Sequence, residues 1–306
     1  MPPDPPLPEP SPAPVLYLTD LTFDRFDPAD LFDLAFLLRS ARLRPVGVCL
    51  SETDGNGQRI ANALEAAART SIPVIGGTDG LRAFLESTTE AVNLMVTGGY
   101  GSVAELLAGH RPLIREKVAR LFLVGGQVND YSAGRAGERL PIDPRLKQRH
   151  PERFDASGDP RVTDPTSFSA LLTSGEGIIW LPRDICLWRY AAPQLLADGG
   201  PLCELLLRET FFRHLTDAGF PADRYDAAEA PVLLSSLPGL LLATEPDPFA
   251  WMRLFRVIPG RVTERDSSVR LETVTDSPNL FVVVAIDGQA LGKLLTAELR
   301  VRPPAV

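Results

Sequence analysis

The sequence has few of the residues that mark disulfide-rich or zinc-binding proteins. Its 306 residues include three cysteines, Cys49, Cys186 and Cys203, which lie far apart and never form a CxxC pair. This spacing indicates neither a zinc knuckle nor a disulfide framework. We therefore predict that the cysteines are buried free thiols.

The sequence also lacks the signals of membrane insertion and of nucleic-acid binding. It has no apolar run of about 18 residues and no charged-then-apolar leader, so we expect no membrane span and no signal peptide, and by default a cytoplasmic protein. Asp and Glu (39) outnumber Lys and Arg (31), the net charge is -8, and no basic cluster appears. This balance argues against a phosphate-backbone partner.

The composition, with 44% hydrophobic residues, is that of a globular protein with a substantial core. Residues 1–14 contain eight prolines and are predicted to form an extended, disordered tail. We expect residues 15–306 to form a single domain. Within it, residues 129–163 are polar and rich in Gly, Pro, Arg and Asp, which indicates a long loop, a lid or an insertion.

Short apolar runs alternate with segments of helical spacing along the chain. We expect strands over residues 15–18, 45–50, 72–77, 91–97, 121–124 and 177–181. We expect helices after residue 28 and over residues 60–68, 202–218 and 232–244, with a polar loop over 51–57. The pattern predicts an α/β fold with a mostly parallel central sheet and helices on both faces.

The C-terminal third has a different pattern. Strands are expected over residues 255–258, 269–274 and 280–286, followed by a last helix over 289–299. The first two strands could form a small antiparallel hairpin, and the third could return to the main sheet.

An acidic stretch follows the first predicted strand and is the main candidate for a functional site. Asp20 ends the strand, Asp24 lies in the loop, Asp27 is placed as a helix N-cap before Pro28, and Asp30 lies in the first helical turn. Carboxylates crowded in this way repel unless a cation or a substrate hydroxyl compensates, and calcium is the obvious cation.

A simpler explanation accounts for part of this stretch. Capping explains Asp27 and Asp30, and a solvated loop explains Asp24. Asp20 favours a site, because open α/β sheets bind ligands at the carboxyl ends of their strands.

Two glycine pairs, at 98–99 and 125–126, also close predicted strands. They are compatible with tight turns or with a site-facing loop, and their spacing does not fit a dinucleotide fingerprint. Asp184 follows the strand over 177–181 and could bind substrate or cap the next helix.

The order of these segments resembles the inosine-uridine-preferring nucleoside hydrolase family from Leu16 onward. The motifs are Leu18-Thr19-Asp20 with Asp27-Pro28-Ala29-Asp30, Asn62-Ala63-Leu64 before Pro73-Val74-Ile75-Gly76-Gly77, the segment from Gly98 to Ala104, Leu123-Val124-Gly125-Gly126, Ile179 to Asp184, and Ser277-Pro278-Asn279-Leu280. Their order and spacing together carry the resemblance, which implies a nucleoside hydrolase-like fold.

The resemblance implies a Ca²⁺ ion that binds ribose hydroxyls and the attacking water. It implies that Asp20 is general base and metal ligand and that Asp30 is a second ligand. Asp54 or Asn56 falls near a family loop asparagine, and Asp155 or Asp159 near a ribose-binding asparagine, with the register open in both cases. A homo-oligomer is expected on the same ground.

Several family positions carry different residues here. Leu18 and Ala29 replace carboxylates of the opening motif, and the family's late His-Asp-Pro motif falls on Ser235-Ser236-Leu237. Fewer carboxylates should weaken calcium binding unless Asp24, Asp27 or Asp33 substitutes.

Two functions follow from these matches and departures. The first is N-ribosyl hydrolysis of a nucleoside or related ribosyl compound by metal-activated water. The alternative is a catalytically impaired pseudoenzyme that uses the fold to bind a ligand or to assemble with a partner. A flavodoxin-like phosphate binder is a weaker third reading, because no glycine loop opens a helix after the first strand.

Overall fold

The computed structural model describes residues 12–21, 28–51, 55–126, 164–186, 188–190, 201–206, 208, 232–234, 236–244, 254–265, 268–273 and 280–300. The strands are β1 Ala13–Thr19, β2 Leu43–Leu50, β3 Val74–Gly76, β4 Val92–Val96, β5 Val118–Val124, β6 Ile178–Leu181, β7 Trp188–Tyr190, β8 Val232–Leu234, β9 Phe255–Arg265, β10 Ser268–Thr273 and β11 Leu280–Ile286. The helices are α1 Pro28–Arg39, α2 Gly55–Ala68, α3 Gly77–Ser87, α4 Tyr100–Gly109, α5 Arg111–Lys117, α7 Pro165–Thr173, α8 Arg183–Cys186, α11 Leu237–Ala243 and α12 Gly288–Arg300.

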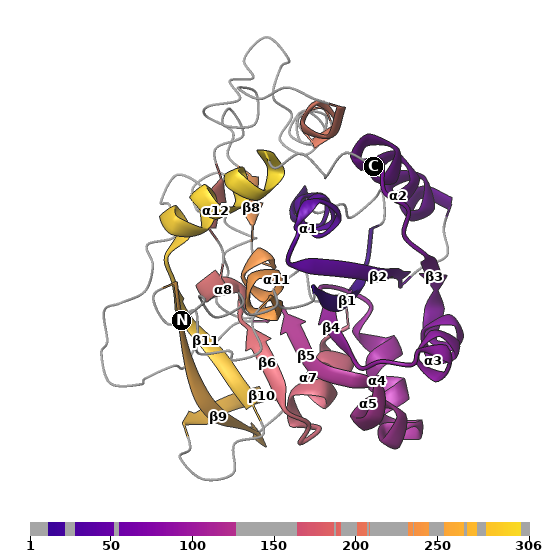
Figure 1. Ribbon diagram of the computed structural model, residues 1–306. Coiled ribbons are helices and arrows are strands. Elements are labelled where there is room, and N and C mark those ends of the chain that lie inside the picture. Colours follow the sequence, from indigo (N-terminus) through magenta and orange to yellow (C-terminus); the bar gives the residue numbers. More distant parts are fainter. Residues whose placement is uncertain are drawn as a thin grey trace, which may run out of the picture.

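The predicted α/β architecture is confirmed. Within the described residues the main sheet has nine strands in the order β10-β9-β11-β6-β5-β4-β1-β2-β3. Strands β1 to β6 and β11 pair in parallel, and β9 pairs antiparallel with both β10 and β11. The hairpin and the returning strand expected in the C-terminal third are therefore present at one end of the sheet (Figure 1).

Helices cover both faces of this sheet (Figure 1). One apolar cluster packs α1, α2, α11 and α12 against one face, and a second packs α3, α4, α5 and α7 against the other. The strands between them are apolar on both sides, as expected for buried parallel strands. No helix in the described part of the chain is long and apolar enough to cross a bilayer.

Strand β1 and helix α1 lie at the centre of this arrangement. In β1, Val15 and Tyr17 belong to the cluster on the α1 side, and Leu16 and Leu18 to the cluster on the opposite side. This is the two-residue alternation of a strand. In α1, every residue from position 29 to position 37 is buried. A helix that is buried on nearly all sides brings its polar side chains into the core.

Several boundaries differ from the sequence-based expectations. Strand β1 starts at Ala13, so two residues assigned to the tail are paired in the sheet. Helix α2 starts at Gly55, inside the expected polar loop, and α8 forms directly after β6. Residues 232–244 do not form one helix: Val232–Leu234 is β8, paired antiparallel with β7, and α11 starts at Leu237.

Two glycine turns are explained by close packing. Gly99 has φ of +63°, and a Cβ there would lie 2.6 Å from Ser51 Cβ. Gly126 has φ of +69°, and a Cβ there would lie 2.7 Å from Phe168 Cε1. The tight-turn interpretation therefore holds at both positions, since other residues adopt this φ only at a cost.

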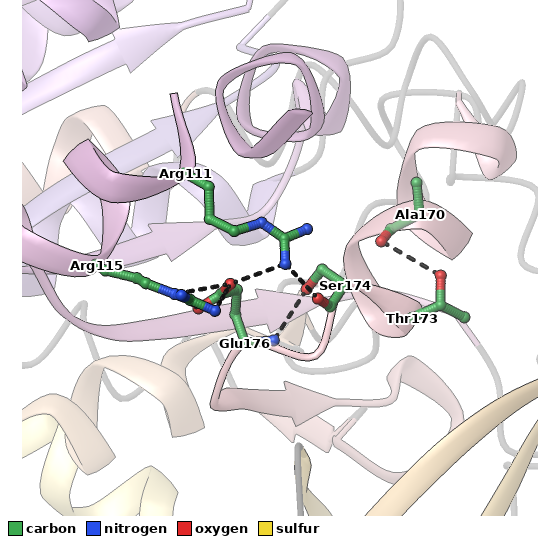
Figure 2. Close-up of polar contacts among 6 residues, drawn as sticks. All are labelled: Arg111, Arg115, Ala170, Thr173, Ser174 and Glu176. Carbon is green, nitrogen blue, oxygen red and sulfur yellow. Dashed lines mark hydrogen bonds and ion pairs between the residues drawn. The ribbon is translucent and has the colours of Figure 1, made fainter. Parts of the chain in front are cut away.

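An ion-pair cluster at the amino-terminal edge of the sheet joins α5 to the turn between α7 and β6 (Figure 2). Glu176, in the turn between α7 and β6, accepts hydrogen bonds of 3.0 to 3.2 Å from the Arg115 guanidinium and lies 3.4 Å from Arg111 Nη1. Arg111 also donates to the Ser174 carbonyl at 3.2 Å. The hydrogen bond from Arg115 to Glu176, together with the Glu176 charge, raises the pKa of Arg115. The cluster lies at the edge opposite the carboxyl ends of the strands.

We expect Glu176→Gln to lower the urea midpoint of unfolding, because the neutral glutamine cannot form an ion pair with either arginine. The difference should shrink in about 1 M NaCl, where screening weakens exposed ion pairs. Glu116→Gln is the matched control, because Glu116 is 70% exposed and pairs with Lys117 alone among the described ion pairs. Equal midpoints for the two variants would contradict the role of the cluster.

The three cysteines are free and buried, as predicted. Burial raises the pKa of Cys49 from 9.0 to about 12. Because this folded-state value lies above the unfolded one, the neutral thiol favours the folded state below about pH 9, and this contribution is lost as the pH rises towards 12.

Alkylation of Cys49 should therefore be slow in the folded protein. At pH 8 we expect iodoacetamide to label Cys49 at least about a hundredfold more slowly in the folded than in the urea-unfolded chain, because the thiolate is the nucleophile. Mass spectrometry of the tryptic peptide gives the rate. Similar rates in both states would contradict the burial of this thiol.

Candidate functional site

The candidate site lies where β1, β2 and β4 end side by side. The Thr97 N–H, just after β4, donates to the Leu18 carbonyl at 2.9 Å, and the Ser51 N–H, just after β2, donates to the Thr19 carbonyl at 3.0 Å. These bonds hold the three strand ends in register. The carboxyl edge of a parallel sheet is where open α/β folds bind ligands.

Asp20 extends from this edge and packs against the turn after β4. A Cβ on Gly98 would lie 2.5 Å from Asp20 Cγ and from Oδ1. Only glycine therefore leaves room for the Asp20 carboxylate in this position. Asp20 as a whole residue is partly exposed at this edge of the sheet.

Asp30 lies on the α1 side of the same strand and is 5% exposed. Its Oδ1 accepts a hydrogen bond from the Tyr17 hydroxyl at 3.2 Å, and its Oδ2 accepts one from Thr19 Oγ1 at 2.7 Å. Both hydroxyls lie on the face of β1 that packs against α1, because residues 17 and 19 are two apart. These hydrogen bonds lower the free-energy cost of burying the Asp30 carboxylate.

A second carboxylate, Asp33, lies one helical turn further along α1 and is fully buried. Its Oδ2 accepts from the same Tyr17 hydroxyl at 3.0 Å. Residues three apart on a helix share a face, so one phenol reaches both carboxylates. Burial, followed by the charges of Asp30 and Asp33, raises the pKa of Tyr17 well above its usual value of 10.0. Tyr17 therefore stays protonated and remains a donor.

Thr97 completes this group of hydroxyls and carboxylates. Its Oγ1 lies 3.2 Å from the Tyr17 hydroxyl oxygen and 3.2 Å from the Leu18 carbonyl oxygen. Its single hydroxyl proton is donated to one of these two acceptors at a time. Thr97 therefore links the buried carboxylates of α1 to the turn that holds Asp20.

The positions that differ from the nucleoside hydrolase pattern are buried. Leu18 is 0% exposed and Ala29 is 2% exposed. Ser236, which precedes α11, is 1% exposed, and its Oγ has no hydrogen-bond partner among the described residues. None of these three side chains carries a charge.

Of the predicted site residues, the structure describes Asp20, which packs against Gly98 just after β4, and Asp30, which is bonded to Tyr17 and Thr19 of β1. Asp24, Asp27, Asp54, Asp155 and Asp159 lie outside the described residues. Asn56 falls in α2 and Asp184 in α8, but the positions of their side chains are not described.

The sequence analysis missed the roles of Tyr17, Thr97 and Asp33 in this network. Tyr17 lies within an apolar strand, which is also where an ordinary core tyrosine lies. The signal that could have found the network is spacing: residues 17 and 19 share a strand face, and residues 30 and 33 share a helix face.

Among the described residues, no group of three or more His, Cys, Asp or Glu side chains could hold a metal ion. The chemistry of two carboxylates nevertheless suits a hard cation. Asp20 and Asp30 offer oxygen donors, and the hydroxyls that bond to Asp30 resemble the outer partners that orient metal-binding carboxylates.

Comparisons with known proteins show which solved structures share this fold. No protein-family model and no curated protein matches the sequence. Among solved structures, the chain is similar to the plant nucleoside hydrolase PpNRh1, with a TM-score of 0.61, 14% identity and coverage of 95% of this chain and 99% of that one. It is also similar to the inosine-uridine-preferring nucleoside hydrolase of Bacillus anthracis, with a TM-score of 0.54, 15% identity and coverage of 94% and 99%.

A third similar structure is the type III effector protein XopQ complexed with adenosine diphosphate ribose. Its TM-score is 0.59 and its identity 16%, with 94% of each chain covered. Similarity at such low identity shows the fold, which is nucleoside hydrolase-like over nearly the whole chain.

The contact between Gly98 and Asp20 can be tested by stability alone. We expect Gly98→Ala to destabilise the chain by about 1–3 kcal/mol, because the new Cβ collides with the Asp20 carboxylate. Removing the collision partner in Gly98→Ala/Asp20→Ala should restore most of the loss. Urea unfolding measures both effects.

Gly101→Ala provides the control for this pair of variants. A Cβ at Gly101 would lie 3.4 Å from Asp164 Oδ2, an ordinary contact, and alanine favours a helix over glycine by about 0.5–1 kcal/mol. If Gly98→Ala is as stable as Gly101→Ala, Asp20 does not lie against Gly98.

Proposed function

We propose that this chain is a nucleoside hydrolase-like protein that binds a nucleoside or a related ribosyl compound at the carboxyl edge of β1 and β4 and hydrolyses its N-glycosidic bond. The observation that carries the proposal is the partly exposed residue Asp20, whose carboxylate is held at that edge against Gly98. The nucleoside hydrolase-like fold supports it.

In the proposed reaction, Asp20 acts as general base. Its carboxylate accepts a proton from a water molecule, whose oxygen forms a new bond to C1′ of the ribose. The bond between C1′ and the base nitrogen breaks, its electron pair leaves with the base, and the base takes up a proton from solvent. A general base of this kind contributes about 10²–10⁴-fold to the rate.

Asp20 and Asp30 are the described residues that would hold a calcium ion, and Asp24 and Asp27 are proposed as further ligands. Bound calcium would fix ribose hydroxyls and lower the pKa of a water molecule. Tyr17 and Thr19 support this assignment, because their hydroxyls fix both oxygens of Asp30. The described residues offer few charged ligands, so we expect weak calcium binding.

Asp54, Asn56, Asp155, Asp159 and Asp184 stay proposed substrate-binding residues. The ligand class is supported by XopQ, whose structure contains adenosine diphosphate ribose. We also propose that the protein forms a homo-oligomer, as the family resemblance implies.

A second function, ligand binding without turnover, is favoured by the uncharged residues at three positions. Leu18 and Ala29 are buried where the family has carboxylates, and Ser236 is buried where a leaving-group acid or a metal ligand is expected. An enzyme that lacks these groups would bind a ribosyl compound yet release its base slowly.

A hydrolysis assay separates the two functions. The full chain is incubated with inosine, uridine, guanosine and adenosine in the presence of calcium, and base release is followed by chromatography. If the chain is an enzyme, Asp20→Asn should lower the rate at least about a hundredfold, and EGTA should abolish it.

Arg115→Ala is the control in this assay, because Arg115 lies at the opposite edge of the sheet. Its rate should equal that of the wild type. Base release that Asp20→Asn leaves unchanged would exclude Asp20 as the base. Release no faster than in buffer, with any of the four nucleosides, would favour the binding function.

A further inference from the structure

The Tyr17 hydroxyl contacts residues from two elements of the site, α1 and the end of β4. Its oxygen lies 3.2 Å from Asp30 Oδ1 and 3.0 Å from Asp33 Oδ2, which share its single proton, and 3.2 Å from Thr97 Oγ1, whose hydroxyl can donate to it. The phenol is fully buried between β1 and α1. One hydroxyl therefore joins the first two turns of α1 to the end of β4.

The contact with Thr97 extends this connection to Asp20. Thr97 precedes Gly98, which packs against the Asp20 carboxylate, and the Thr97 N–H is bonded to the carbonyl of β1 residue Leu18. The path from Asp30 to Asp20 thus runs through Tyr17, Thr97 and Gly98. The hydrogen bonds among Asp30, Tyr17 and Thr97 can polarise one another, and the last step, from Gly98 to Asp20, is a packing contact.

We propose that Tyr17 is a positioning residue: its hydroxyl holds the Asp30 carboxylate in register with the β4 turn that holds Asp20, so that both carboxylates address one ligand. The functional part of this inference rests on the proposed function. The structural part, the coupling between Tyr17 and Asp30, does not.

Packing alone does not account for a hydroxyl at this position. The neighbouring residues of β1, Leu16 and Leu18, are apolar and fully buried, and a phenylalanine at position 17 would fill the same space. Burying a phenol and two carboxylates costs free energy that apolar side chains of similar size would avoid. The cost is reasonable if the network fixes a carboxylate that binds a ligand.

A double-mutant cycle tests the coupling without any ligand. Tyr17→Phe, Asp30→Asn and the double variant are unfolded in urea. We expect the double variant's unfolding equilibrium constant to differ at least about threefold from the product of the two single effects, because contacting residues are coupled. If Asp30→Asn does not fold, Asp33→Asn replaces it, since it contacts the same hydroxyl.

Tyr100 provides the matched control for this cycle. It is also a buried tyrosine, but the acceptors of its hydroxyl are main-chain carbonyls: Val124 at 2.7 Å and Thr97 at 3.2 Å share its single proton. Tyr100→Phe should combine with Asp30→Asn additively. Equal coupling in the two cycles would overturn the proposal.

Calcium titration by calorimetry, after treatment with EGTA, tests the functional part. We expect Tyr17→Phe to weaken calcium binding about 10–100-fold, as outer-shell changes do, and Tyr100→Phe to leave it within about twofold. Thr19→Val should also weaken binding, and Thr19→Ser, which keeps the hydroxyl, should restore it.

The outcomes separate the two proposals. If Tyr17→Phe binds calcium as Tyr100→Phe does, the positioning role is wrong although the metal site stands. If the wild type takes up no calcium, the metal part of the proposed function is wrong, and the unfolding cycle alone decides whether Tyr17 holds Asp30.

Discussion

The hydrogen bonds that Asp30 accepts from Tyr17 and Thr19 constrain the whole candidate site. A carboxylate that is 5% exposed in an apolar core is tolerable only when its oxygens are satisfied, and β1 supplies a hydroxyl to each of them. This requirement fixes how α1 lies on β1, because the donors alternate along the strand with the buried Leu18.

Asp20 and the uncharged residues Leu18 and Ala29 lie in different surroundings. Asp20 is partly exposed, and the absence of a side chain at Gly98 leaves room for its carboxylate. Leu18 and Ala29, at the two positions where the nucleoside hydrolase resemblance implies carboxylates, are packed into the core. A site with fewer charges can bind a neutral ribosyl group through hydrogen bonds while holding a cation less tightly.

The sequence predicts the fold well because its signals are local. Strand and helix periodicity correctly indicated most elements of the parallel sheet, and Pro28 with Asp30 marked the start of α1. The prediction of a single helix over 232–244 was wrong, because two apolar runs lie so close together that helical spacing fits both. Pro238, in the first turn of α11, marks where the helix begins and separates it from β8.

The site is less predictable from sequence, because its contacts join residues far apart in the chain. The position of Asp20 follows from its place after a strand, but the bond between Tyr17 and Thr97 spans 80 residues. No local pattern shows such a contact, and a tyrosine in an apolar strand looks like an ordinary core residue. The similar solved structures, at 14% and 16% identity, show the fold, but they do not show where the side chains of this chain lie.

Binding of a ribosyl ligand at Asp20 is the central claim, since both proposed functions require it. Isothermal titration calorimetry of the full chain with inosine and with adenosine diphosphate ribose tests it most directly. We expect one of the two ligands to bind the wild type, Asp20→Ala to weaken this binding at least about tenfold, and Arg115→Ala to leave it unchanged. Binding that is unchanged in Asp20→Ala, or no binding of either ligand, would show that Asp20 does not bind a ribosyl ligand.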